Sequence, residues 1–143
     1  RNVLGYMDAN TTEVDPKTSK PVIALMDEQM HITDKGGTMR LGAQQCELAE
    51  DSIARAAYGE AHITERHRHR YEFNNDFKDV LTEAGLKATG INPDSGLVEI
   101  IEVEDHPFFV GVQYHPEYKS TVVKPHPLFV AFIKACDEFH QNK

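Results

Sequence analysis

A histidine and a glutamate two residues apart are the first candidates for chemistry in this sequence. They lie in residues 111–117, GVQYHPE, directly after the apolar run at residues 108–110. Strand spacing predicts that this stretch carries His115 out of a sheet at the edge where open α/β sheets bind their ligands. Glu117 would then accept a hydrogen bond from one imidazole nitrogen and leave the other free as a base, as in a nucleophile, base and orienter arrangement. The alternative for so short a motif is a strand end followed by a proline turn.

Arginines and histidines alternate over residues 66–71, RHRHRY. If this segment is extended, the arginines lie on one side and His67, His69 and Tyr71 on the other. Three guanidinium groups on one side favour a carboxylate or phosphate site, since their planar donors bind such groups bidentately. A metal site at His67 and His69 is less favoured, because no further ligand follows at a familiar spacing and neighbouring arginines repel cations. A solvated basic edge strand is the third interpretation.

Short apolar or alternating runs predict the strands that would position these residues. The expected strands cover residues 22–26, 36–48, 61–65, 86–91, 97–103 and 108–114, and the first of them is expected to be buried. Gly36-Gly37 is expected in a hairpin turn rather than a phosphate loop, because no Gly-Lys-Ser/Thr ending follows it. Residues 8–13 are typical of a polar turn, and residues 1–6 of the end of a helix with Gly5 near its C-cap.

Two short helices and two turns are predicted between these strands. Asp51-Ser52 would cap a helix that ends at Gly59, and Asn75 would cap a second helix that stops at Gly85. Residues 92–96, NPDSG, predict a turn, and residues 104–107 would join the last two strands as a hairpin.

The carboxyl-terminal segment predicts an amphipathic helix that begins at His126-Pro127 and covers the sheet. Its apolar residues fall at helical spacing: Leu128, Phe129, Phe132, Ile133, Cys136 and Phe139. On that inner face Cys136 is expected to be a small buried hydrophobic residue rather than a reactive thiol.

Composition limits the class of protein. With 143 residues, 40% of them hydrophobic, the chain fits one ordinary domain of mixed α and β structure. No apolar run approaches the roughly 18 residues of a membrane span, and the first residues lack the apolar segment of a signal peptide. The net charge of −8 argues against general nucleic-acid binding. The two cysteines, Cys46 and Cys136, favour free thiols in a reducing compartment. Because the chain opens without Met, we expect a fragment.

Five segments together resemble a known family. They are GGTMRLG at residues 36–42, ERHRHRYE at 65–72, LVEIIE at 97–102, QYHPE at 113–117 and HPLF at 126–129. The combination is similar to the class I, or triad, glutamine amidotransferases, and within them to the carboxyl-terminal part of the CTP synthase family. The resemblance extends over essentially all of the chain. The Arg-His alternation together with GGTMR is what points to that particular group of amidotransferases.

The resemblance implies a fold and a set of roles. The fold would be α/β, the three-layer flavodoxin-like fold of class I amidotransferases, with residues 1–143 as its carboxyl-terminal portion. The reaction would be glutamine hydrolysis by a cysteine thiolate, and the ammonia would serve the amination of UTP to CTP in a separate synthase domain. His115 matches the family's catalytic histidine and Glu117 the glutamate that orients it. Glu13 matches a residue that binds the amino group of glutamine, and Arg70 a residue that would hold its α-carboxylate.

The resemblance also implies cofactors and partners. No cofactor or metal is expected in this chain, whereas the full enzyme would use ATP and Mg²⁺, with GTP as activator. The partners would be glutamine, the rest of the amidotransferase domain and the synthase domain. The full enzyme would be a cytoplasmic homo-oligomer without nucleic-acid or membrane partners.

One part of the family pattern is missing from these residues. The family's nucleophile lies in a Gly-x-Cys-Leu-Gly-x-Gln elbow, which is expected just before residue 1. Cys46 lies in QQCEL without a glycine elbow and Cys136 lies on the predicted inner face of the last helix, so neither is the expected nucleophile. The isolated chain is therefore expected to be catalytically incomplete. The alternative function is an inactive amidotransferase-like module that binds glutamine or a nucleotide.

Overall fold

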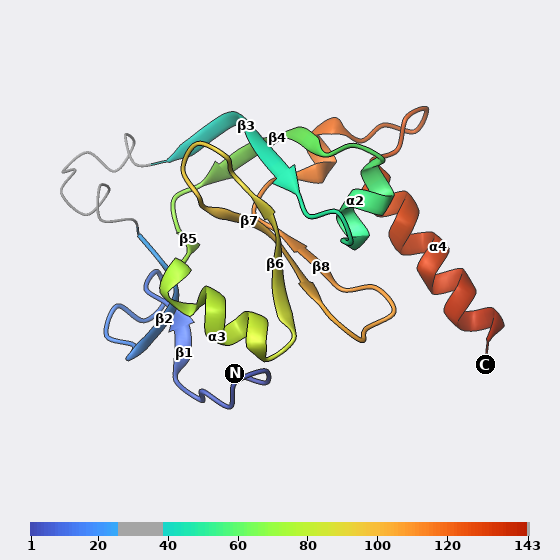
Figure 1. Cartoon of the computed structure of the whole chain (residues 1–143). Helices are drawn as coiled ribbons and strands as arrows, with labels where there is room; N and C mark the ends of the chain where they lie inside the picture. The colour runs from blue at the N-terminus through green and yellow to red at the C-terminus, as the bar shows by residue number, and fades with distance from the viewer. Residues whose placement is uncertain (26–38, 143) are drawn as a thin grey trace.

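Two β-sheets form the centre of the structure, a computed structural model that describes residues 1–25 and 39–142 (Figure 1). The larger sheet has the strand order β4-β3-β6-β7-β8, and all its neighbouring strands are antiparallel. Its strands are β3 (Arg40–Leu48), β4 (His62–His69), β6 (Leu86–Ile91), β7 (Val98–Val103) and β8 (Val110–Val112). The expected strands in this part of the chain are thus present, with shorter ends at β7 and β8.

The smaller sheet has the order β1-β2-β5 and combines a parallel with an antiparallel pair. Its strands are β1 (Ala9–Thr11), β2 (Lys20–Ala24) and β5 (Glu72–Phe73). Strand β1 corrects the expectation of a turn alone, because pairing with β2 holds this polar segment extended. Strand β2 begins before the expected residue 22 and is half-buried rather than buried. The hairpin expected at Gly36-Gly37 lies outside the described residues.

Strands β3 and β4 pair along nearly their whole length and place the basic segment. Side chains alternate along β4 between exposed and buried positions. Arg66 and Arg68 are exposed, whereas His67 is buried and His69 is half-buried. The alternation predicted for this segment is therefore confirmed from residue 66 to residue 69.

A close approach and a tight turn join β6 to β7. A Cβ atom on Gly90 would lie 2.5 Å from Cγ1 of Ile100, so only glycine allows the two strands this spacing. In the turn predicted at residues 92–96, the Asn92 side chain accepts hydrogen bonds from two following backbone amides at 3.0 Å each. The turn is thus stabilised locally, and it leads into the buried first half of β7.

Helix α2 (Ile53–Tyr58) has the predicted ends. The Ser52 hydroxyl accepts a hydrogen bond from the Arg55 amide at 2.9 Å, and Gly59 adopts the left-handed conformation with φ of 73°. In addition, the buried carboxylate of Glu102 on β7 accepts hydrogen bonds from the first two amides of the helix, both at 2.9 Å. A negative charge at this end of a helix is favourable, and it ties α2 to the sheet.

Helix α3 (Lys78–Glu83) follows a short 3-10 turn, η2 (Asn75–Phe77). The predicted cap, Asn75, is wrong by one residue, because the side chain of Asn74 accepts the capping hydrogen bond. Gly85 has a φ of 87° and ends the helical segment, as predicted.

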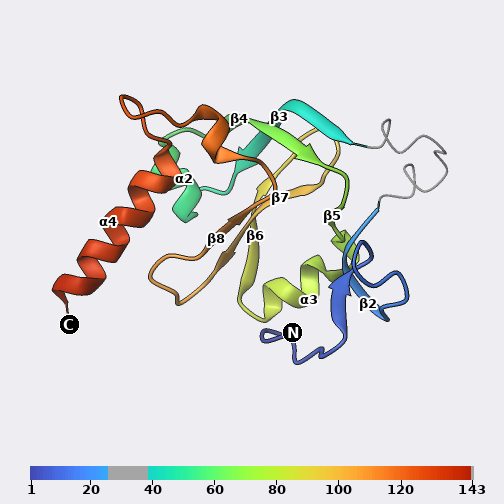
Figure 2. The same cartoon turned by 180° about the vertical axis from the view of Figure 1, so that it is seen from behind.

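Helix α4 (Pro127–Gln141) begins where predicted, with His126 as its N-cap. The expectation that it covers the sheet is wrong. Only Leu128 on its apolar face is buried, Cys136 is exposed, and the other apolar residues of that face are 43% to 65% exposed. Both views show α4 running away from the strands after its first turns (Figure 2), and a groove of about 380 Å³ separates it from β8. No helix among the described residues is long and apolar enough to cross a membrane.

Candidate active site

The predicted pair His115 and Glu117 is hydrogen-bonded. His115 lies just beyond β8, as the N-cap of the 3-10 helix η3 (Pro116–Lys119). Its Nδ1 lies 2.7 Å from Oε1 of Glu117. A carboxylate can only accept, so we assign the proton to Nδ1, which leaves Nε2 with a free lone pair. The hydrogen bond lowers the pKa of the Glu117 carboxyl group and keeps it ionised. This is the geometry a general base and its orienting acid require.

Backbone hydrogen bonds hold the histidine in place. The His115 amide donates to the Arg66 carbonyl at 2.9 Å, which fixes the segment against the middle of β4. The Tyr118 amide donates to the His115 carbonyl at 3.1 Å and closes the turn of η3. Because these bonds use the main chain, the side chain of His115 stays available, and 36% of it is exposed.

Gln113 connects this segment to the one that carries Arg70. Its side-chain oxygen accepts from the Phe73 amide at 3.1 Å, and its side-chain nitrogen donates to the Tyr71 carbonyl at 3.3 Å. The residue after Arg70 is thereby hydrogen-bonded to a residue two positions before His115. Sequence reasoning included Gln113 in the motif but gave it no role.

The register of the smaller sheet brings Glu13 and Arg70 to one end. Thr11 pairs with Ile23, and Ile23 pairs with Phe73 in the opposite direction. Residues after β1 and residues before β5 therefore leave the sheet at the same end, and these include Glu13 and Arg70. The two residues predicted to bind opposite ends of glutamine thus belong to segments that leave the smaller sheet at the same end. Gln113 links the segment after Arg70 to the one that carries His115.

A cavity of about 830 Å³ lies over the basic strand. It is lined by Met39, Leu41, Gly42, Arg66, His67, Arg68 and Tyr118. Arg66 and Arg68 are exposed and contribute positive charge at one wall of this cavity, and the carboxylate or phosphate site expected there stays a prediction. Arg70, the third arginine, is not among its lining residues.

The two histidines of β4 hydrogen-bond to each other. Nδ1 of His67 lies 2.7 Å from Nε2 of His69, whose Nδ1 lies 3.2 Å from the Tyr71 carbonyl. Burial, reinforced by the charge of Arg40, lowers the pKa of His67 to about 3 and of His69 to about 4, so both rings are neutral at pH 7. The described residues contain no group of three His, Cys, Asp or Glu side chains that could hold a metal ion.

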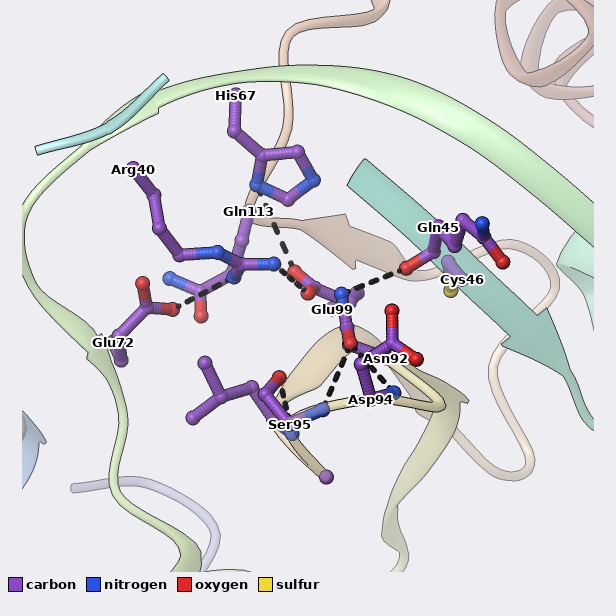
Figure 3. A network of polar contacts seen from close by, with 12 residues as sticks. Arg40, Gln45, Cys46, His67, Glu72, Asn92, Asp94, Ser95, Glu99 and Gln113 are labelled. Carbon is purple, nitrogen blue, oxygen red and sulfur yellow. Dashed lines mark hydrogen bonds and ion pairs between the residues drawn. The ribbon is translucent and has the colours of Figure 1, made fainter. Parts of the chain in front are cut away.

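A buried charge cluster beneath these histidines was missed by sequence reasoning (Figure 3). Arg40 on β3 lies 2.5 Å from Glu99 on β7 and 3.3 Å from Glu72 on β5, so it joins the two sheets. Glu72 is 1% exposed and Glu99 is fully buried. Burial raises the pKa of Glu72 to about 7 and also raises the pKa of Glu99. A signal existed in residues 98–100, VEI, where a glutamate interrupts a run of buried apolar residues.

A second buried polar group supports the residue next to His115. The Tyr58 hydroxyl lies 3.1 Å from each of three polar atoms, in Glu65, Tyr114 and His126. His126 and Glu65 are themselves 3.1 Å apart. Sequence reasoning treated His126 only as the start of a helix. The cluster connects α2, β4 and α4 to Tyr114 and so stabilises the position of the motif.

The two cysteines lie in contrasting environments. Burial raises the pKa of Cys46 to about 12, so its thiol stays protonated, and a Cβ on Gly90 would be only 2.8 Å from its sulfur. Cys136 is exposed on α4, which corrects its predicted burial; the helix face that carries it is not packed against the sheet.

The sequence of the chain matches a known family. Residues 8–135 match the family described as glutamine amidotransferase class-I. The chain therefore belongs to the class I glutamine amidotransferases, and the predicted fold class is confirmed.

Within that family, the chain is similar to curated CTP synthases. The chain is 66% identical over 143 residues to the CTP synthase of Flavobacterium psychrophilum, covering 100% of the chain and 26% of that protein. It is 62% identical over 142 residues to the CTP synthase of Flavobacterium johnsoniae, covering 99% of the chain and 26% of that protein. The chain thus spans about a quarter of the length of the curated relatives it matches.

A solved structure gives the same result for the fold. The glutaminase domain of Trypanosoma brucei CTPS with bound acivicin is 34% identical, with a TM-score of 0.87. The match covers 96% of this chain and 54% of that one. The resemblance to the CTP synthase family predicted from the sequence is confirmed by these relatives.

Proposed function

We propose that this chain is part of a glutamine-hydrolysing CTP synthase and supplies the base of its glutaminase reaction. The observation that carries the proposal is the 2.7 Å hydrogen bond between Nδ1 of His115 and Glu117, which leaves Nε2 free to take a proton. The similarity to CTP synthases over the whole chain supports it.

In the proposed reaction, Nε2 of His115 takes the proton of a cysteine thiol, and the thiolate attacks the side-chain amide carbon of glutamine. The C–N bond then breaks as the imidazolium gives its proton to the leaving nitrogen, which departs as ammonia. Water hydrolyses the resulting thioester to glutamate. Glu117 holds the required tautomer throughout and stabilises the imidazolium that forms between the two proton transfers.

Glutamine would be held by Glu13 and Arg70. A carboxylate for the α-amino group and a guanidinium for the α-carboxylate are complementary in charge, and a guanidinium binds a carboxylate in two parallel hydrogen bonds. Their position at one end of the smaller sheet, linked through Gln113 to the His115 segment, supports this role.

The remaining parts of the reaction belong to the full enzyme. We propose that ammonia aminates UTP to CTP in a synthase domain that uses ATP and Mg²⁺, with GTP as activator, in a cytoplasmic homo-oligomer. The nucleophile must come from outside these residues, because Cys46 is buried with a raised pKa and Cys136 lies on the exposed face of α4. The isolated chain is therefore expected not to hydrolyse glutamine.

The test is His115→Ala in the complete enzyme. The glutaminase kcat should fall by a factor on the order of 10² to 10⁴, the usual contribution of general acid–base catalysis. CTP formation from added ammonia should continue, which shows that the protein is folded. His62→Ala, an exposed histidine on the same strand as Arg66, is the matched control and should leave both activities unchanged. Ammonia release that persists in His115→Ala would refute the assignment, and glutamine binding without hydrolysis in the unaltered enzyme would favour a binding module.

A further inference from the structure

Tyr118 stacks on the ring of His115. The two ring centroids are 4.9 Å apart and the planes are inclined by 22°. This is an offset-stacked geometry that aromatic pairs favour. The tyrosine is 48% exposed, so the contact is not a result of tight core packing around it. The first turn of η3 holds the two residues together, because the Tyr118 amide donates to the His115 carbonyl.

The stack and the Glu117 hydrogen bond restrain different motions of the imidazole. The hydrogen bond at Nδ1 fixes one atom of the ring but allows the plane to turn about the bond. A flat ring stacked on the imidazole opposes that turning. Together the two contacts leave one direction for Nε2, the atom with the free lone pair. Without the stack, the exposed side chain of His115 would sample more orientations, and fewer of them would be productive.

We propose that Tyr118 is a positioning residue for His115, and that its aromatic face rather than its hydroxyl orients the imidazole. This inference rests on the proposed function of His115 as the base. The structure gives the Tyr118 hydroxyl no hydrogen bond among the described residues, whereas the ring contact is specific. Tyr118 also lines the cavity over Arg66 and Arg68, so its substitution leaves open space rather than a hole in the core.

The experiment compares Tyr118→Leu with Tyr118→Phe in the complete enzyme, with kcat and KM for glutamine measured separately. Leucine removes the stack, and the glutaminase kcat should fall roughly three- to tenfold, the range expected for losing an aromatic pair. KM should stay the same, because Tyr118 is not placed on glutamine. Phenylalanine keeps the flat ring and should restore most of the rate. Tyr118→Met serves as a second non-aromatic variant if the leucine variant folds poorly, and CTP formation from added ammonia reports folding in each case.

A double-mutant cycle separates this inference from the proposed function. If Tyr118 acts through His115, the leucine substitution should cause no further loss in a His115→Ala background. Three results would overturn the positioning role while leaving His115 as the base. They are an equal loss of kcat in both backgrounds, a change confined to KM, and a full rate in Tyr118→Leu. An undiminished rate in His115→Ala alone would instead overturn the proposed function, and the positioning role with it.

Discussion

Replacing Glu72 by glutamine should change how the stability of the amidotransferase domain depends on pH. Arg40 is the cation between two buried carboxylates, and it lies closer to Glu99, at 2.5 Å, than to Glu72, at 3.3 Å. One positive charge does not compensate two negative ones, so Glu72 is the group that retains a proton. Burial raises its pKa from 4.5 to about 7 in spite of the attraction of Arg40.

The direction and the size of this pH effect on stability follow from the linkage between protonation and folding. Between pH 4.5 and pH 7 the folded protein holds a proton on Glu72 that the unfolded chain has lost. The stabilisation is present below pH 4.5 and is lost as the pH rises through 7. Since one pKa unit corresponds to about 1.4 kcal/mol, raising the pH from about 5 to about 8 should cost the unaltered protein roughly 2 to 3 kcal/mol at this group. Glu72→Gln cannot ionise and should avoid that cost.

The assay is urea unfolding of the complete amidotransferase domain across this pH range, followed by circular dichroism. Between pH of about 5 and about 8, the unfolding free energy of Glu72→Gln should rise relative to that of the unaltered protein by roughly 2 to 3 kcal/mol. His67 and His69 act in the opposite direction, since their pKa values of about 3 and about 4 make stability fall with decreasing pH, but they are present in both proteins. Glu104→Gln, an exposed control, should give parallel curves. If the unfolding free energy of Glu72→Gln changed with pH in the same way as that of the unaltered protein, the reasoning would be refuted.

Two further substitutions follow from contacts of the sheet and the site. Gly90→Ala should destabilise the domain by about 1 to 3 kcal/mol, because the added methyl group overlaps Ile100. Thermal unfolding would show this destabilisation as a lower Tm. An unchanged Tm would mean that β6 can move away from β7. Gln113→Ala should raise KM for glutamine by about tenfold, because it removes the hydrogen bonds to Phe73 and Tyr71 that hold the segment of Arg70. Steady-state glutaminase kinetics of the complete enzyme would test this prediction. An unchanged KM would mean that Gln113 does not support the glutamine pocket.

Local signals in the sequence were sufficient for most strands and for the caps of α2. Ser52 and Gly59 act through bonds within a few residues, so their residue types determine the helix ends without help from the rest of the fold. The His115 and Glu117 hydrogen bond is equally local, because only Pro116 lies between the two residues. Their roles as base and orienter stay predictions, as do those of Glu13 and Arg70, because they depend on glutamine and on a nucleophile elsewhere.

Helix α4 shows where periodicity is insufficient. Its apolar residues do share a face. A hydrophobic stripe indicates only that one face of a helix packs against another surface, and it does not indicate which surface that is. The described residues offer contacts mainly to the first turns, where Leu128 is buried. The prediction that this face covers the sheet was wrong because the helix direction is set by packing between distant segments, which periodicity does not encode.

The basic segment shows how a correct pattern led to an incomplete conclusion. The alternation correctly placed Arg66 and Arg68 on one face of β4, and the need for an opposing anion was argued from these arginines. Both are exposed, where water screens their repulsion and lowers the need for a partner. The arginine that does hold buried carboxylates is Arg40, whose partners are 32 and 59 residues away in the sequence. No spacing rule connects positions so far apart. A buried charge in a strand does require a partner, however. Glu99, which lies between two apolar neighbours in the sequence, was therefore more informative about an ion pair than the exposed arginines of β4.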